Sequence, residues 1–135
     1  MIKLTELFNF VESMLPKGVY KSVTWNSMNE DEKGIVGIFE LPSKNDILTM
    51  EGTEISESMK FQIQVNCNDG EEGMDEADKY LRQFLKNIES AYYDDGKLEI
   101  IDVYHLGPKS KRVEQNGFNI SIRNCEINID YLIKE

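Results

Sequence analysis

The stretch FQIQVNCNDGEEGMDEADKYLRQFLKNI, residues 61–88, decides the fold. From Phe61 to Cys67 every second residue is apolar and the residues between them are polar, which is the pattern of a strand with one buried and one wet face. Residues 74–88 then place apolar side chains at three- and four-residue steps, the pattern of an amphipathic helix. A strand and a helix of this kind predict a sheet whose apolar face is covered by the helix.

The chain before this stretch predicts a first helix and two further strands. Apolar residues recur at helical spacing over residues 3–15, and Pro16 and Gly18 end that helix. The runs GVYKSVTW and GIVGIFEL are rich in β-forming residues, and the turn-forming segment NSMNEDEKG separates them, so residues 18–41 predict a hairpin. Residues 42–58 keep neither period and predict a long loop.

The chain after this stretch predicts two more strands. Residues 98–106, LEIIDVYHL, form the first, and residues 107–117, GPKSKRVEQNG, read as a polar connection. In the last strand the apolar positions change phase between Ile122 and Cys125. Because a one-residue slip turns every side chain to the opposite face, we expect a bulge near Arg123 and Asn124.

These elements predict one α+β domain over residues 1–135. We expect a mostly antiparallel five-stranded sheet with two helices packed on one face, because both helical stripes are then buried. The other sheet face is expected to be comparatively polar, through Gln62, Gln64, Asn66, Asn128 and Asp130.

Charge and composition narrow the classes of function. The formal net charge is −10, from 25 acidic against 15 basic residues, so the average surface repels a phosphate backbone and we expect no sequence-specific nucleic-acid binding. The opening residues lack the uninterrupted apolar stretch of a secretory signal, and no segment reaches the roughly 18 apolar residues of a membrane span. We expect a protein made and kept in the cytoplasm, or released by a route that needs no signal. Cys67 and Cys125 are expected to be buried free thiols, and a disulfide between them stays open if their strands are neighbours.

Neither catalytic nor metal-binding residues form a readable constellation. An acidic cluster could hold Ca²⁺ or Mg²⁺, but it lacks the spacing of an EF-hand loop and is better explained as the acidic, soluble start of the second helix: Asp69, Glu71, Glu72, Asp75, Glu76 and Asp78. His105 is the only histidine and is expected to be structural, although a pair with Cys125 stays open. No Gly-rich phosphate loop is present in the sequence. We expect no enzyme, no cofactor and no metal.

Two groups of residues are candidates for protein contacts. Lys109, Lys111 and Arg112 make a short basic run that fits either a solvated turn or pairing with an acidic face of a neighbouring subunit. The second group is aromatic and fits either interface anchors or ordinary core positions: Trp25, Tyr92, Tyr93, Tyr104 and Tyr131.

The order of elements resembles one family of phage proteins. The strand FQIQVNC, the helix beginning at GMDEADKYLRQFL and the terminal strand NCEINIDYLI, with its closing phrase N-x-x-I-N-I-D-Y, look like the minor capsid and tail terminator proteins of tailed phages. This family is also called tail completion or head-tail joining proteins. The resemblance covers Leu4 to Ile133, and it is one of layout rather than of a catalytic motif.

The resemblance implies a structural protein of the virion, made in the cytoplasm of a bacterial host. Its subunits would form a hexameric ring that caps the tail tube, joins it to the head connector and lets DNA pass, without a cofactor. A place on the capsid side of the junction stays open.

A ring subunit needs long loops that reach a neighbour. Loop length alone nominates residues 42–58 and 107–117, and with them seven interface residues: Lys44, Asp46, Glu51, Glu54, Lys109, Lys111 and Arg112. The alternative is a monomeric or dimeric binding module that holds a peptide or protein with the 42–58 loop or the polar sheet face.

Overall fold

The computed structural model describes residues 4–20, 22–28, 33–41, 49–51, 54–67, 70–91, 93–94, 96, 98–115 and 118–134. For residues 4, 49–51, 54–56, 70–71, 111–115, 118–120 and 134 it describes the backbone only. The elements follow one another as α1 (Leu4–Ser13), β1 (Ser22–Trp25), β2 (Ile35–Glu40), β3 (Thr49–Glu51), β4 (Glu54–Asn66), α2 (Gly70–Glu89), β5 (Leu98–Gln115) and β6 (Phe118–Lys134).

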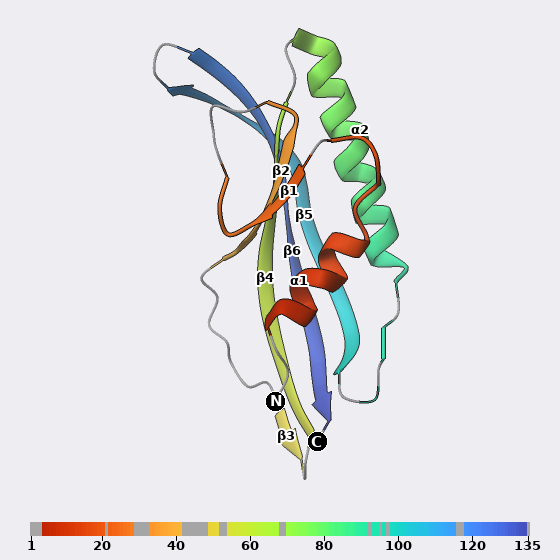
Figure 1. Cartoon of the computed structure of the whole chain (residues 1–135). Helices are drawn as coiled ribbons and strands as arrows, with labels where there is room; N and C mark the ends of the chain where they lie inside the picture. The colour runs from red at the N-terminus through yellow and green to blue at the C-terminus, as the bar shows by residue number, and fades with distance from the viewer. Residues whose placement is uncertain are drawn as a thin grey trace.

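The predicted α+β class is confirmed. Five strands lie in the order β1-β2-β4-β6-β5, and the short β3 pairs with the start of β4. Figure 1 shows both helices on one side of this sheet. The sheet is mixed rather than wholly antiparallel, because β1 and β2 run parallel while the other described pairs are antiparallel.

The predicted hairpin over residues 18–41 is therefore wrong in direction. Ser22 pairs with Ile35 and Trp25 with Ile38, so both strands point the same way. Asn26 ends β1 with a positive φ of 54°; its backbone N–H donates to the Ile38 carbonyl at 2.8 Å, and its side-chain oxygen accepts from the Glu40 N–H at 2.9 Å. The turn-forming residues do follow the end of β1. However, β2 begins beside Ser22, at the start of β1, and not beside its end.

The predicted loop over residues 42–58 is also wrong in part. Residues 42–48 lie outside the described residues. Thr49–Glu51 instead forms β3, which pairs with β4 from Glu54 to Ser56. At this end of β4 the residues are mostly polar, because Ile55 is the single apolar residue from Glu54 to Ser58. The spacing of apolar residues therefore could not reveal this part of the strand.

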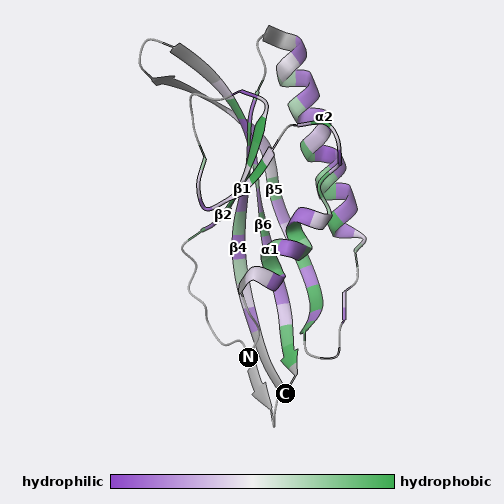
Figure 2. Ribbon diagram, in the orientation of Figure 1, coloured by the Kyte–Doolittle hydropathy of each residue, from purple (hydrophilic) through white to green (hydrophobic). Residues whose placement is uncertain are grey.

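The core lies between the helices and the apolar face of the sheet. Phe8 of α1 stacks on Trp25 and meets Phe61 of β4 edge-on, each with ring centroids 5.1 Å apart. Figure 2 shows the apolar positions of α2 on its side toward the sheet. Phe61, Ile63 and Val65 are each fully buried, so the opening strand supplies the centre of the core.

The opposite face of the sheet carries the expected polar side chains. The Ser58 hydroxyl donates to the side-chain oxygen Oδ1 of Asn128 at 3.0 Å, and the side-chain Nδ2 of Asn128 donates to Asp130 Oδ1 at 3.1 Å. At one end this face is covered: Ile35 and Ile122 are 2% and 3% exposed, and they flank Asn66 in the strand register. Burial on both faces explains the phase change in β6.

The predicted bulge near Arg123 and Asn124 is consequently wrong. The pairing of β6 with β4 runs without interruption from Lys134 to Ile122. The register shifts lie instead on β5, where Ile101 is one extra residue and Gly107 with Pro108 faces the single Cys125. The predicted polar connection over residues 107–117 is wrong as well, because β5 continues through it to Gln115.

Candidate interaction surfaces

The β5–β6 hairpin extends beyond the rest of the sheet. The last pair between β4 and β6 joins Asn66 to Ile122. Beyond it, residues 111–115 pair with residues 118–122. Apart from a bond from the Cys67 N–H to the Ser121 carbonyl, no third strand joins them in the part of the chain that the structure describes. We call residues 111–115 and 118–121 the arm. Figure 1 shows the arm projecting from the end of the sheet, to the side away from α2.

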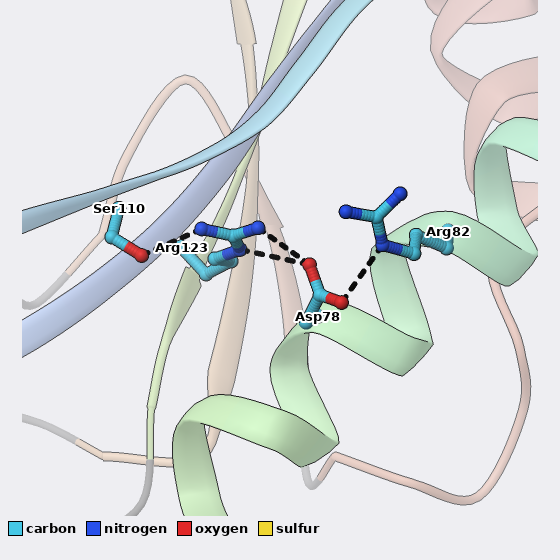
Figure 3. Close-up of polar contacts among 4 residues, drawn as sticks. All are labelled: Asp78, Arg82, Ser110 and Arg123. Atoms are coloured by element: carbon cyan, nitrogen blue, oxygen red, sulfur yellow. Dashed lines mark hydrogen bonds and ion pairs between the residues drawn. The ribbon is translucent and has the colours of Figure 1, made fainter. Parts of the chain in front are cut away.

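An ion pair fixes the base of the arm to α2, as Figure 3 shows. The Arg123 guanidinium donates to Asp78 Oδ1 from Nε at 3.1 Å and from Nη2 at 2.5 Å, while its Nη1 donates to the Ser110 hydroxyl at 2.7 Å. Arg82 donates to the other oxygen of Asp78 at 2.8 Å. The base is therefore held to the body of the protein at a charged, half-buried contact.

Burial alone would raise the pKa of Asp78, but hydrogen bonds from Arg82 and Arg123 outweigh it and hold this pKa below the usual range. An unfolded aspartate titrates near 3.9. The ion pair therefore adds stability that is complete above about pH 5 and is lost as pH falls through the lowered pKa.

We expect Asp78→Asn to lower the free energy of unfolding at pH 7 by about 1–2 kcal/mol, because Arg123 is left half-buried without its carboxylate. Urea unfolding at pH 7 and pH 3 measures the difference in unfolding free energy between the variant and the wild type. This difference should be smaller at pH 3. Arg82→Ala is the matched control: its side chain is 64% exposed, so its loss should cost only about 0.5 kcal/mol or less. Equal losses for both variants at pH 7 would contradict the claim that the Asp78–Arg123 pair stabilises the base of the arm.

A glycine bulge lies in β5 shortly before the arm begins. Gly107 has a φ of +103°, and a Cβ there would lie 3.3 Å from the backbone of Asn124 and of Cys125. Bulges bend the strand that carries them. The Gly107 bulge therefore helps to set the direction of the arm.

We expect Gly107→Ala to destabilise the protein by about 1–3 kcal/mol, since a side chain at this φ is strained and also meets backbone. Gly96→Ala is the control, because Gly96 has a φ of +87° but open space around its Cβ position. Chemical denaturation of both variants should show the larger loss for Gly107. A larger loss for Gly96 would mean that close packing at the bulge is unimportant.

Strand β5 also exposes three large apolar side chains. Ile101, Tyr104 and Leu106 are 54%, 56% and 60% exposed. Tyr104 and Leu106 pair with Asn128 and Glu126 of β6, and their register places them on the sheet face opposite the helices. A shallow depression of about 160 Å³ lies beside them. We call Tyr104 and Leu106 the apolar patch.

A second, larger hollow lies beside the end of α1. Its volume is about 570 Å³, and its walls include Glu12, Lys17, Tyr20 and Tyr80. Glu12 accepts a hydrogen bond from the Trp25 indole at 3.1 Å. Among the described residues the buried Tyr20 hydroxyl has no partner, and burial raises the pKa of Tyr20 above its ordinary value. The walls mix polar and apolar groups and hold no arrangement of nucleophile and base.

The seven interface residues nominated from the sequence are not brought together. Lys44 and Asp46 lie outside the described residues. Glu51 pairs with Glu54 where β3 meets β4, at the end of the sheet opposite the arm. The basic residues do gather: Lys109 is exposed beside the arm, and the backbone places Lys111 and Arg112 on it. The Asp78–Arg123 pair and the apolar patch were not identified from the sequence.

The aromatic candidates divide between core and surface. Trp25 packs on Phe8, Tyr93 packs against Phe10, and Tyr131 is 2% exposed. Tyr92 lies outside the described residues. Tyr104 alone among the described candidates has the exposure that an interface anchor needs.

The residues with nucleophilic or ligating chemistry do not converge. Cys67 and Cys125 are buried free thiols, as expected, and burial raises the pKa of Cys125 to about 12. His105 lies 3.8 Å from Glu89 of α2, and no hydrogen bond joins it to Cys125. Within the described ranges, no three His, Cys, Asp or Glu side chains gather as metal ligands.

No protein-family model matches the chain, and no curated protein matches it. Of the two helices described, neither is both long and apolar enough to cross a membrane.

Proposed function

We propose that this chain is a structural subunit of the head-tail junction of a tailed phage or prophage. Copies of it form a ring, expected to be hexameric, that caps the tail tube and joins it to the head connector. The chain is made in the cytoplasm of the bacterial host and resides in the virion. The work is mechanical and needs neither an active site nor a cofactor.

The arm is the observation that carries this proposal. A two-stranded ribbon is marginally stable in water unless something packs on it, yet this one extends beyond its sheet from a base held by the Arg123–Asp78 pair. A bulge at Gly107 precedes it in β5. A segment built in this way fits a contact with another protein better than it fits a free surface loop. The resemblance of layout to tail terminator proteins supplies the kind of assembly.

Attachment to tail tubes tests the proposal. The gene is expected between genes for a capsid or connector protein and a major tail protein. Tubes assembled from that neighbouring tail protein should carry gold-labelled copies of this chain at one end only, and tube growth should stop there. Label spread along the tubes, or absent from them, would contradict the proposal.

The apolar patch is expected to contribute to attachment. We predict that Tyr104→Ser combined with Leu106→Ser will leave the melting temperature nearly unchanged, because substitutions at exposed positions usually alter stability by about 0.5 kcal/mol or less. The fraction of tube ends that carry the chain should fall, since exposed aromatic and aliphatic side chains anchor many protein contacts. Lys86→Ser, at an exposed position of α2 away from the depression, is the control. Unchanged labelling would remove the patch from the junction.

The apolar patch also favours the second candidate, a small binding module. The uncovered sheet face around Tyr104 could hold a peptide in the depression beside it. This function would require a monomer or dimer that binds a peptide and shows no preference for tube ends. The same labelling experiment therefore separates the two functions.

A further inference from the structure

We propose that the arm of one copy docks on the first half of α2 of the next copy, and that this contact is the repeating joint of the assembly. The inference rests on the proposed function and adds to it the two surfaces that meet. The receiving surface contains three exposed acidic residues of α2: Glu72, Asp75 and Glu76.

The arm cannot use its own helix in this way. Arg123 already ties the arm's base to Asp78, and from this base the arm and the first turns of α2 diverge. Figure 1 shows them on different sides of the sheet end. An arm that needs a partner and points away from its own acidic helix can reach that helix only in another copy.

Charge favours this partner over other surfaces. The arm together with the adjacent Lys109 and Ser110, residues 109–121, contains three bases and one acid, a net charge of +2, so the rest of the chain carries −12. Within the body, residues 70–78 of α2 hold five acids and no base. Opposite charges brought together in this way steer association and fix which surfaces meet.

The contact is heterologous, because it joins two different surfaces. Each copy offers one arm and one acidic helix, so every copy can both give and receive. Contacts of this type close into a ring when the rotation between copies permits, and otherwise grow into filaments. A ring at the end of a tube needs a joint of this kind.

Exchange of charges between the two surfaces tests the inference. The arm-reversed variant carries Lys109→Glu, Lys111→Glu and Arg112→Glu. The helix-reversed variant carries Glu72→Lys, Asp75→Lys and Glu76→Lys. Sedimentation in about 0.1 M salt, where the screening length is about 10 Å, measures the assembly of each variant alone and of the two mixed.

Each variant alone should associate about 100-fold more weakly than the wild type, since like charges then face each other. Mixing should restore assembly, because each arm again meets a helix of opposite sign. The restored species should contain equal numbers of the two variants in alternation. Assembly of the arm-reversed variant at wild-type strength, or failure of the mixture to assemble, would overturn the inference.

Two further variants control for the change in net charge and for loss of folding. Reversal of the exposed residues Lys17, Lys60 and Lys86, which lie outside both proposed surfaces, to Glu makes the same change in net charge as the arm reversal, and it should leave assembly nearly unaltered. If the helix-reversed variant fails to fold by circular dichroism, Glu72→Gln with Asp75→Asn and Glu76→Gln replaces it. Weaker assembly is then expected without charge reversal.

The outcomes separate this inference from the proposed function. A wild-type ring that caps tubes but is insensitive to charge reversal would overturn the joint and leave the function standing. A wild-type chain that stays monomeric at low salt would also overturn the joint. Its binding to tube ends would then decide the function separately.

Discussion

A chain whose arm is shortened will fold but will not form rings. Replacing residues 113–120 by Asn-Gly keeps the pairs Lys111 with Ile122 and Arg112 with Ser121, and closes them with a two-residue turn suited to a hairpin. The Arg123–Asp78 pair and the Cys67 N–H bond to the Ser121 carbonyl at 2.9 Å are retained. The body should therefore keep its structure.

Assembly is expected to fall sharply although Lys109, Lys111 and Arg112 remain, because the projecting ribbon is removed and no other described strand extends beyond the sheet at this end. Sedimentation velocity should show a monomer of the shortened chain at every concentration at which the wild type is assembled. Circular dichroism and the melting temperature should remain close to those of the wild type. Normal rings from the shortened chain would show that the arm is not the joint.

Phe61→Ala is expected to have the largest effect on stability. The Phe61 ring is fully buried in β4 and contacts Phe8 of α1 edge-on. Its removal leaves a cavity beneath the helix, with an expected loss of about 3–5 kcal/mol in the free energy of unfolding. Domains of this size have about 5–15 kcal/mol in total, so the loss is a large share of the stability and the melting temperature should fall markedly.

Tyr104→Ala is the control for this substitution. It removes an aromatic ring of similar size that is 56% exposed, so its loss should cost about 0.5 kcal/mol or less. Urea titration followed by Trp25 fluorescence measures both variants, because Trp25 stacks on Phe8 in the same core. Similar losses for the two variants would contradict the position of the core.

The central part of the fold could be predicted because its patterns are local. FQIQVNC alternates cleanly and residues 74–88 keep a helical stripe, so β4 and α2 followed from period alone. The direction of β1 relative to β2 could not, since turn-forming residues mark the end of a strand but do not say where the chain returns. Pairing partners depend on contacts between distant residues, which one sequence does not display.

The position of the apolar patch could not be predicted from the spacing of apolar residues, because a bulge changes the face on which later residues lie. In LEIIDVYHL the residues Leu98, Ile100, Tyr104 and Leu106 share one phase, which predicts a single apolar face. Ile101 is an extra residue in the pairing with β6. It turns Tyr104 and Leu106 to the opposite face while Leu98 and Ile100 stay in the core.

The candidate surface was found in part. The basic run at Lys109, Lys111 and Arg112 was identified correctly as a concentration of charge, but its polar composition and its Gly-Pro start suggested a loop. It is a strand because β6 pairs with it along its whole length. In residues 109–115, KSKRVEQ, Val113 is the single apolar residue, so this half of the hairpin shows no hydrophobic alternation from which a strand could be inferred.

The molar mass of the wild-type chain, measured by light scattering as salt is raised, tests the central claim most directly. The arm-to-helix joint predicts a closed species of about six copies at low salt that dissociates toward the 15.6 kDa monomer as charges are screened. A monomer at every concentration in low salt, or an assembly whose mass does not respond to salt, would contradict it.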